Sequence, residues 1–333
     1  MSLKKIAEMV GVSPSTVSRV LNDRSSSCAS EAVKQKIWEA AHEINYIPNP
    51  AARRLKLGET PASPTLRLAV VLARIDHLQQ DPFFRELYRE LEIEILKNGY
   101  SLAKTYTASR VGEIPHGEYD GIIILGRCFG SLLQTLSEIT RNLVGIWRNP
   151  INYEIDEIVC DGREAARLAV TYLIEKGHQK IGYIGDCSSE SRYVGYTETM
   201  ILHQLPLDYD CIVSTDHTEQ TGYEAMLQIR QVTDMTAVLC ANDISAAGAL
   251  RALREHRASD RRKISVISID NIEEAQSTRP MLTTVHIPRR DMAHMALQVL
   301  TDRIRRGHTE KMRVEFPCQI VERESVFRNQ TAE

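Results

Sequence analysis

From residue 65 onward the sequence alternates short apolar runs with longer amphipathic segments, and this alternation constrains the fold more than any other feature. The run 66–72 predicts a buried strand, and 82–97 predicts a helix that ends at Asn98 and Gly99. The further expected strands are 101–105, 121–125, 143–147, 157–160, 180–184, 211–213, 236–240 and 264–268, and the further helices are 162–176, 190–202, 219–230 and 242–255. Uninterrupted apolar strands between helices are typical of parallel sheets with helices on both faces, so an α/β core is expected.

The first sixty residues follow a helical pattern with no strands. Apolar residues at helical spacing predict a helix over 3–10, and Gly11 can adopt the left-handed conformation that ends it. Ser13 is a good N-cap for a second helix to about residue 22, which has one apolar stripe and an otherwise polar surface. A third helix near 30–44 completes a small core. This pattern predicts a helix-turn-helix, although a helical hairpin with an accidental polar face would share it.

A short basic segment follows the three helices. Asn49 can cap a helix that has Pro50 at its first position, and this helix is less than two turns long. So short a helix is unstable alone and forms only when something packs against it.

The charge distribution also sets this end of the chain apart: residues 1–58 carry nine Lys and Arg against five Asp and Glu, a net of +4, and the remainder carries −7. A basic head on an acidic body suits binding to phosphate.

The composition argues against several other classes of protein. No apolar run is long enough for a membrane helix, and the first residues do not resemble a signal peptide, so a cytoplasmic protein is expected. The seven cysteines are scattered without a CxxC pair, which predicts reduced core thiols and no metal site. No phosphate-binding glycine loop and no nucleophile–base pair is recognisable, so neither a cofactor nor an enzymatic activity is expected.

Two motifs in the amino-terminal region are specific enough to indicate a family. GVSxxTVSRVLN over 11–22 and NYxPNxxARxL over 45–55 resemble the lactose-repressor/galactose-repressor (LacI/GalR) family of bacterial regulators. The resemblance implies that Pro14, Ser15 and Arg19 face base edges in the major groove and that Leu55 wedges into the minor groove. The other DNA-binding residues it implies are Ser13, Thr16, Ser18, Asn22, Tyr46, Asn49, Ala52 and Arg53.

The resemblance continues through nearly the whole body, including 173–185, 241–248 and 265–270. It implies a periplasmic-binding-protein-like core of two Rossmann-like lobes joined by three crossovers, preceded by the small helical domain. The implied division is a helix-turn-helix domain over 1–48, a hinge helix and linker over 49–64, and an effector-binding and dimerisation domain over 65–333. Lobe one takes about 65–160 and 288–317, with a helix at about 288–306, and lobe two takes about 161–287 and 318–333, with a strand near 318–326.

Three charged residues stand at or beside junctions between strands and helices, where ligands bind in such sheets: Arg192, Asp243 and Asp270. A guanidinium and two carboxylates suit hydroxyl-rich ligands, because each can engage two neighbouring hydroxyls. Asp243 can instead be only a helix cap, and Arg192 only a structural ion-pair partner. Further effector-binding candidates are Trp147, His217 and Phe84, although an aromatic residue at a strand end often belongs to the core.

The sequence thus predicts a homodimeric DNA-binding repressor of a carbohydrate-utilisation operon, released from a pseudo-palindromic operator by a sugar-like inducer. The alternative is a regulator that responds to a nucleobase or phosphorylated metabolite acting as corepressor. A plain sugar-binding protein would lack the DNA-binding head. No leucine-heptad tail follows Glu324, so a dimer is expected rather than a tetramer.

Overall fold

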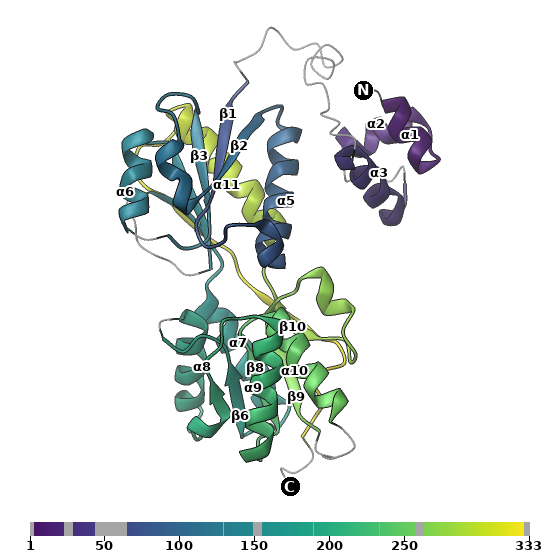
Figure 1. Ribbon diagram of the computed structural model, residues 1–333, viewed down its shortest axis with the longest axis vertical. Helices are drawn as coiled ribbons and strands as arrows, with labels where there is room; N and C mark the ends of the chain where they lie inside the picture. The colour runs from purple at the N-terminus through teal and green to yellow at the C-terminus, as the bar shows by residue number, and fades with distance from the viewer. Residues whose placement is uncertain are drawn as a thin grey trace.

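A computed structural model of the 333-residue chain describes residues 3–22, 29–43, 65–128, 130–148, 155–188, 190–232, 234–256 and 263–329. Within these ranges the chain forms a small amino-terminal helical bundle and two α/β lobes (Figure 1). No helix in the described ranges has the length and apolar character that crossing a membrane requires.

The amino-terminal bundle consists of α1 (Leu3–Val10), α2 (Pro14–Asn22) and α3 (Glu31–Glu43). Gly11 has a φ of +73° and ends α1, and the Ser13 hydroxyl accepts a hydrogen bond from the Thr16 amide at 3.1 Å. The three helices enclose one apolar cluster formed by Ile6, Ala7, Val17, Val20, Leu21, Ile37, Ala40 and Ala41. Because α2 gives this cluster only its apolar stripe, its polar residues remain on the outside.

The first lobe is built on a parallel six-stranded sheet with the order β11-β5-β4-β3-β1-β2. The strands are β1 (Arg67–Leu72), β2 (Ser101–Thr107), β3 (Gly121–Leu125), β4 (Leu143–Trp147), β5 (Asp156–Val159) and β11 (Arg313–Glu315), and the helices are α5 (Pro82–Lys97), α6 (Gly130–Ile139) and α11 (Arg289–Ile304). Ile123 packs in one cluster with α5 and α11, whereas Ile122 and Ile124 pack in another with α6. Helices therefore cover both faces of the sheet, as the apolar strands predict.

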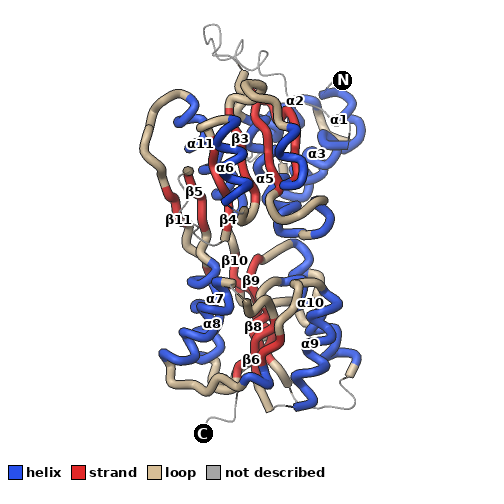
Figure 2. The backbone as a smooth tube through the Cα atoms, turned by 60° about the vertical axis from the view of Figure 1, so that its left-hand side comes forward, coloured by secondary structure: helices blue, strands red, loops and turns tan. Residues whose placement is uncertain are grey.

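The second lobe repeats this architecture with the strand order β12-β10-β9-β8-β6-β7 (Figure 2). Its strands are β6 (Ile181–Ile184), β7 (Ile212–Val213), β8 (Ala237–Cys240), β9 (Ser265–Asp270), β10 (Thr283–His286) and β12 (Gln319–Val321), and its helices are α7 (Gly162–Glu175), α8 (Ser191–Leu202), α9 (Glu219–Val232) and α10 (Asp243–Glu255). All neighbouring strands are parallel except β12, which runs antiparallel to β10.

The chain passes between the lobes three times: between β5 and α7, between β10 and α11, and between β11 and β12. The first sheet thereby receives β11, and the second receives the strand expected near the carboxyl terminus, β12. With the small helical region at the amino terminus, these two parallel-sheet lobes confirm the predicted fold class.

Some elements were missing from the sequence prediction. The helix α6 and the strands β10 and β11 were not expected, and neither were the short 3-10 turns η1 (Leu78–Gln80), η2 (Ala108–Glu113), η3 (Tyr209–Cys211) and η4 (Glu273–Gln276). In α6 the apolar residues Leu133 and Leu136 are buried at helical spacing, so a signal was present in the sequence. The 3-10 turns contain few residues and show no such period.

Candidate functional site

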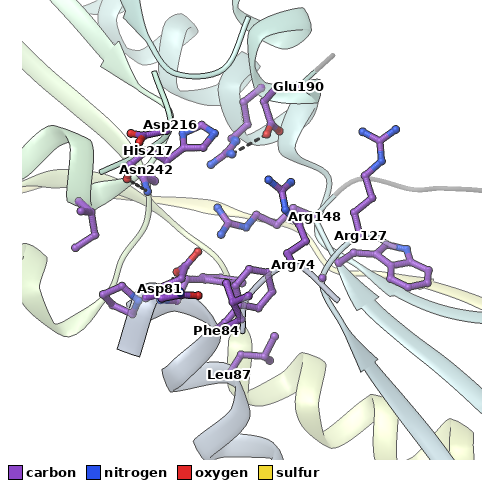
Figure 3. Close-up of a pocket in the computed structure, with 18 of the residues that line it drawn as sticks. Arg74, Asp81, Phe84, Leu87, Arg127, Arg148, Glu190, Asp216, His217 and Asn242 are labelled. Carbon is purple, nitrogen blue, oxygen red and sulfur yellow. Dashed lines mark hydrogen bonds and ion pairs between the residues drawn. The ribbon is translucent and has the colours of Figure 1, made fainter. Parts of the chain in front are cut away.

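A cavity of about 290 Å³ lies between the two lobes, at the edge where the parallel strands of both sheets end. Lobe one contributes residues that follow β1, β3 and β4 together with the first turn of α5, and lobe two contributes residues that follow β6, β7 and β8. Figure 3 shows side chains from both lobes facing the same space. This is the position at which sheets of this class bind ligands.

Arg192 lines the cavity from the first turn of α8 and forms an ion pair with Glu190. Its Nη2 lies 2.8 Å from Glu190 Oε2, its Nη1 donates to the Ala241 carbonyl, and both side chains are buried. Burial alone would raise the pKa of Glu190, but the Arg192 guanidinium holds that pKa well below its usual range. Within the described residues Arg192 Nε has no hydrogen-bond partner, so one donor of the buried guanidinium stays unused.

Asp270 ends β9 and is paired across the lobes with Arg148, which directly follows β4. Arg148 Nη1 lies 2.8 Å from Asp270 Oδ1, and the Arg148 guanidinium lies 4.0 Å from the centre of the Phe83 ring. Burial raises the pKa of Asp270 to about 7, although Arg148 opposes that shift. Arg148, rather than Asp270 itself, forms the cavity wall at this point.

Asp243 lies away from the cavity lining, because its carboxylate is occupied inside lobe two. It accepts hydrogen bonds from Ser268 Oγ at 2.5 Å, Thr284 Oγ1 at 2.6 Å and the Ile272 amide at 2.8 Å. The N-cap of α10 is Asn242, whose Oδ1 accepts from the Ser245 amide at 3.0 Å. Asn242 lines the cavity, and its Nδ2 donates to the His217 carbonyl at 3.1 Å. Asp243 is therefore not among the described residues that line the cavity, and its contact with a ligand stays a prediction.

The three aromatic candidates all line the cavity, but in different ways. Phe84 is buried at the start of α5. Trp147 is also buried, and its indole folds back over Gly145, where an added Cβ would lie only 1.9 Å from the ring. Trp147 thus packs chiefly in the lobe-one core. Burial, reinforced by Arg192, lowers the pKa of His217 to about 4, so the imidazole is neutral at physiological pH.

Sequence reasoning did not select five further residues that shape the cavity: Arg74, Arg127, Arg148, Glu190 and Asn242. Four of them lie within two residues of a strand end, and the exception is Glu190, which precedes α8. Position after a buried strand was the signal that could have identified them, as it did for Asp270.

The other candidate site is the outer surface of α2. Ser13, Pro14, Ser15 and Arg19 are exposed, and Thr16 and Ser18 are partly so, whereas Val17 and Val20 are buried. The Ser13 hydroxyl lies 2.7 Å from the Ser15 hydroxyl and 2.8 Å from the Thr16 hydroxyl. Asn22 ends the helix. The remaining DNA-binding candidates, Tyr46, Asn49, Ala52, Arg53 and Leu55, lie outside the described residues.

Comparisons with known proteins match the regions of the chain that contain the two candidate sites. Residues 2–49 match the family described as bacterial regulatory proteins, lacI family, and residues 170–326 match the periplasmic binding protein-like domain. The HTH-type transcriptional repressor PurR of Photorhabdus laumondii is 29% identical over 340 residues, which cover 98% of this chain and 96% of the relative. A PurR of Aliivibrio salmonicida is 28% identical over 344 residues, covering 98% and 99% of the two chains.

Two solved structures share the fold over nearly the whole chain. The complex of the transcriptional regulator CelR with cellobiose has a TM-score of 0.69 at 24% identity and covers 98% of this chain and 100% of that one. A Lac repressor dimer bound to operator and the anti-inducer ONPF has a TM-score of 0.68 at 23% identity and covers 98% and 99%. These two likenesses concern the fold, whereas the two family matches show that the chain belongs to the lacI family of bacterial regulatory proteins.

Proposed function

We propose that this DNA-binding transcriptional regulator is a homodimeric repressor that releases its operator when a small sugar-like ligand binds between the lobes. One observation carries the proposal: the chain combines an exposed polar recognition helix with a polar cavity at the junction of two lobes. The proposed division places the DNA-binding domain at 1–48, the hinge and linker at 49–64 and the ligand-binding, dimer-forming part at 65–333.

The outer surface of α2 is proposed to enter the major groove. Arg19 is exposed on it, and a guanidinium can donate two hydrogen bonds to one guanine. The Ser13, Thr16 and Ser18 hydroxyls are suited to phosphate oxygens. One head offers few base contacts, so specific binding requires two heads on a pseudo-palindrome. The Lac repressor to which this chain is similar is a dimer bound to operator.

The cavity is proposed to hold a ligand about the size of one sugar ring. Its volume of about 290 Å³ is at the small end for a ligand pocket. Arg192 and the Asn242 amide line the cavity and offer N–H donors to ligand hydroxyls, and the Phe84 ring provides an apolar surface. Two similar solved structures contain a bound sugar, cellobiose in one and ribose in the other.

Control of DNA binding is proposed to act through the contacts between the lobes. Beside the Arg148–Asp270 pair, Arg85 is 2.5 Å from Glu274 of the other lobe, and the Glu273 amide donates to Glu86 at 3.0 Å. A ligand held between the lobes favours the lobe arrangement that it fits better. Only that difference in affinity can shift the population of DNA-binding dimers.

The proposal includes a non-catalytic role in the cytoplasm, where the operator is. The relatives that match this chain over nearly its full length are named as transcriptional repressors. Purified protein is therefore expected to return sugars and nucleotides unchanged after prolonged incubation, and turnover of either would contradict this part of the proposal.

Fluorescence anisotropy tests the proposal with the full chain and labelled duplexes from the DNA that flanks its gene. We expect tight binding to one duplex and weakening when the inducing sugar is added. Tightening by a ligand would replace the inducer by a corepressor. Equal binding to every duplex at near-physiological salt would contradict sequence-specific recognition.

A further inference from the structure

We propose that the effector is an anionic sugar derivative, whose phosphate or carboxylate is bound by Arg74 with Arg148 and Arg127 on the lobe-one wall of the cavity. This inference rests on the proposed function, because it assumes that the cavity binds the effector. It adds the charge of the ligand and the residues that recognise that charge.

The charged residues of the cavity are segregated by lobe. Among the described residues, lobe one contributes three arginines, Arg74, Arg127 and Arg148, and a single carboxylate, Asp81. The Asp81 carboxylate caps α5, since its Oδ1 accepts a hydrogen bond from the Phe83 amide at 2.9 Å. Lobe two contributes one arginine and three carboxylates. The cavity therefore has one electropositive wall, formed by lobe one.

Two of the three lobe-one arginines have no hydrogen-bond or ion-pair partner among the described residues. Arg148 is paired with Asp270, as Arg192 is with Glu190 on the opposite wall. Neither Arg74 nor Arg127 makes a hydrogen bond or ion pair within the described part of the chain, and both are exposed. Figure 3 shows Arg74 beside Arg148, both extending into the space that faces Glu190, with Arg127 farther along the same wall.

The aliphatic stem of Arg74 lies close to Gly126 on this wall. Gly126 follows β3 with a φ of +86°, and a Cβ at that position would lie 2.9 Å from the Phe84 ring and 3.3 Å from Arg74 Cγ. Because Gly126 has no side chain, the stem of Arg74 can lie close to the backbone that lines the cavity there. A stem packed in this way loses less freedom when its guanidinium binds a ligand.

His217 responds to the positive charge in the cavity. Burial is the largest cause of its lowered pKa, which is about 4; Arg192, Arg148 and Arg74 lower that pKa further, whereas Glu190 raises it. Its Nδ1 has no hydrogen-bond partner among the described residues.

Guanidinium groups bind phosphates and carboxylates through paired charge-assisted hydrogen bonds, which a neutral hydroxyl cannot equal. A neutral sugar would leave the charge on Arg74 uncompensated, whereas an anionic derivative would compensate it.

Calorimetry with the full-length protein tests this inference without DNA. The probes are glucose, galactose and fructose, their monophosphates, the carboxylates gluconate and galacturonate, and inorganic phosphate. Arg74→Gln removes the proposed anion contact. Arg141→Gln is the matched control, because Arg141 is an exposed lobe-one arginine at the opposite end of β4. Operator release by the same probes is measured in parallel by anisotropy.

We expect one anionic derivative to bind more tightly than its neutral parent sugar. Arg74→Gln should weaken that binding about 10- to 100-fold, as expected for a lost charged hydrogen bond, and Arg141→Gln should leave it unchanged. Sugar phosphates and sugar carboxylates are titrated separately, so the measured affinities show which anionic group the protein prefers. Binding of neutral sugars only, of no anion in the panel, or of an anion insensitive to Arg74→Gln overturns the inference. Anion binding that fails to affect the operator contradicts the proposed regulation instead.

Discussion

Arg148 and Asp270 meet across the two lobes, with 2.8 Å between Arg148 Nη1 and Asp270 Oδ1. Arg148 directly follows β4 in lobe one, and Asp270 ends β9 in lobe two. Arg289, at the start of α11, reinforces the junction, because its Nη1 donates to the Asp270 carbonyl and its Nη2 to the Asn271 carbonyl at 2.8 Å. The lobe-one wall of the cavity is thereby tied to the strand ends of lobe two.

Asp270→Asn removes the charge from this junction and keeps its shape. We expect the ligand response to be lost or greatly weakened, because Arg148 is no longer held in the cavity wall. Operator affinity without ligand should stay nearly unchanged, since α2 is untouched. Anisotropy titrations with and without ligand measure both quantities. A normal response in Asp270→Asn would remove this pair from the mechanism.

The pH dependence of stability should also depend on Asp270. Burial raises its pKa to about 7 in the folded chain, whereas an exposed aspartate titrates near 3.9. Protonated Asp270 therefore stabilises the fold fully below about pH 4, and this contribution is lost as pH rises through about 7. In urea unfolding, the free energy of unfolding should fall less between pH 5 and pH 8 in Asp270→Asn than in the unmodified protein. Identical pH profiles of the two proteins would refute the raised pKa.

Asp243→Ala should destabilise lobe two rather than affect ligand contact directly. The substitution leaves Ser268, Thr284 and the Ile272 amide without their acceptor, at a cost of about 2–4 kcal/mol. Asp216→Ala is the control, because that exposed carboxylate accepts hydrogen bonds from the nearby Thr218 and Thr221 hydroxyls, and it should cost under about 1 kcal/mol. Denaturant unfolding measures both values. Equal costs would show that the buried network contributes little.

Arg19→Ala should relax sequence discrimination. Arg19 is exposed on α2, and loss of a two-pronged contact to guanine costs about 1–3 kcal/mol of discrimination at one base pair. Binding to unrelated duplexes should change little. Lys36→Ala, at an exposed position on α3, is the control. An equal loss of affinity for all duplexes would make Arg19 a phosphate contact.

Much of the fold could be predicted from the sequence, because the relevant signals are local. The run Gly121–Leu125 is wholly buried and was predicted as a strand from its continuous apolar character. The cap at Ser13 and the turn at Gly11 likewise depend on neighbouring residues. The unexpected helix α6 shows where a local signal was present but was not used.

The cavity was harder to predict, because its residues converge only in three dimensions. Asp243 and Asn242 are adjacent in sequence, yet one faces the interior of lobe two and the other the cavity. Arg148 and Asp270 are separated by 122 positions along the chain. The direction of a side chain at a strand end depends on the twist of the sheet and on packing, and neither can be inferred from the local sequence pattern.

The central claim is that two amino-terminal heads of one dimer read DNA together. Selection from a pool of random duplexes by the full-length protein at near-physiological salt tests it most directly. We predict enrichment of two inverted half-sites about one helical turn apart, bound by a dimer in sedimentation of the complex. Enrichment of a single unrepeated site by a monomer, or no enrichment at all, would contradict the account.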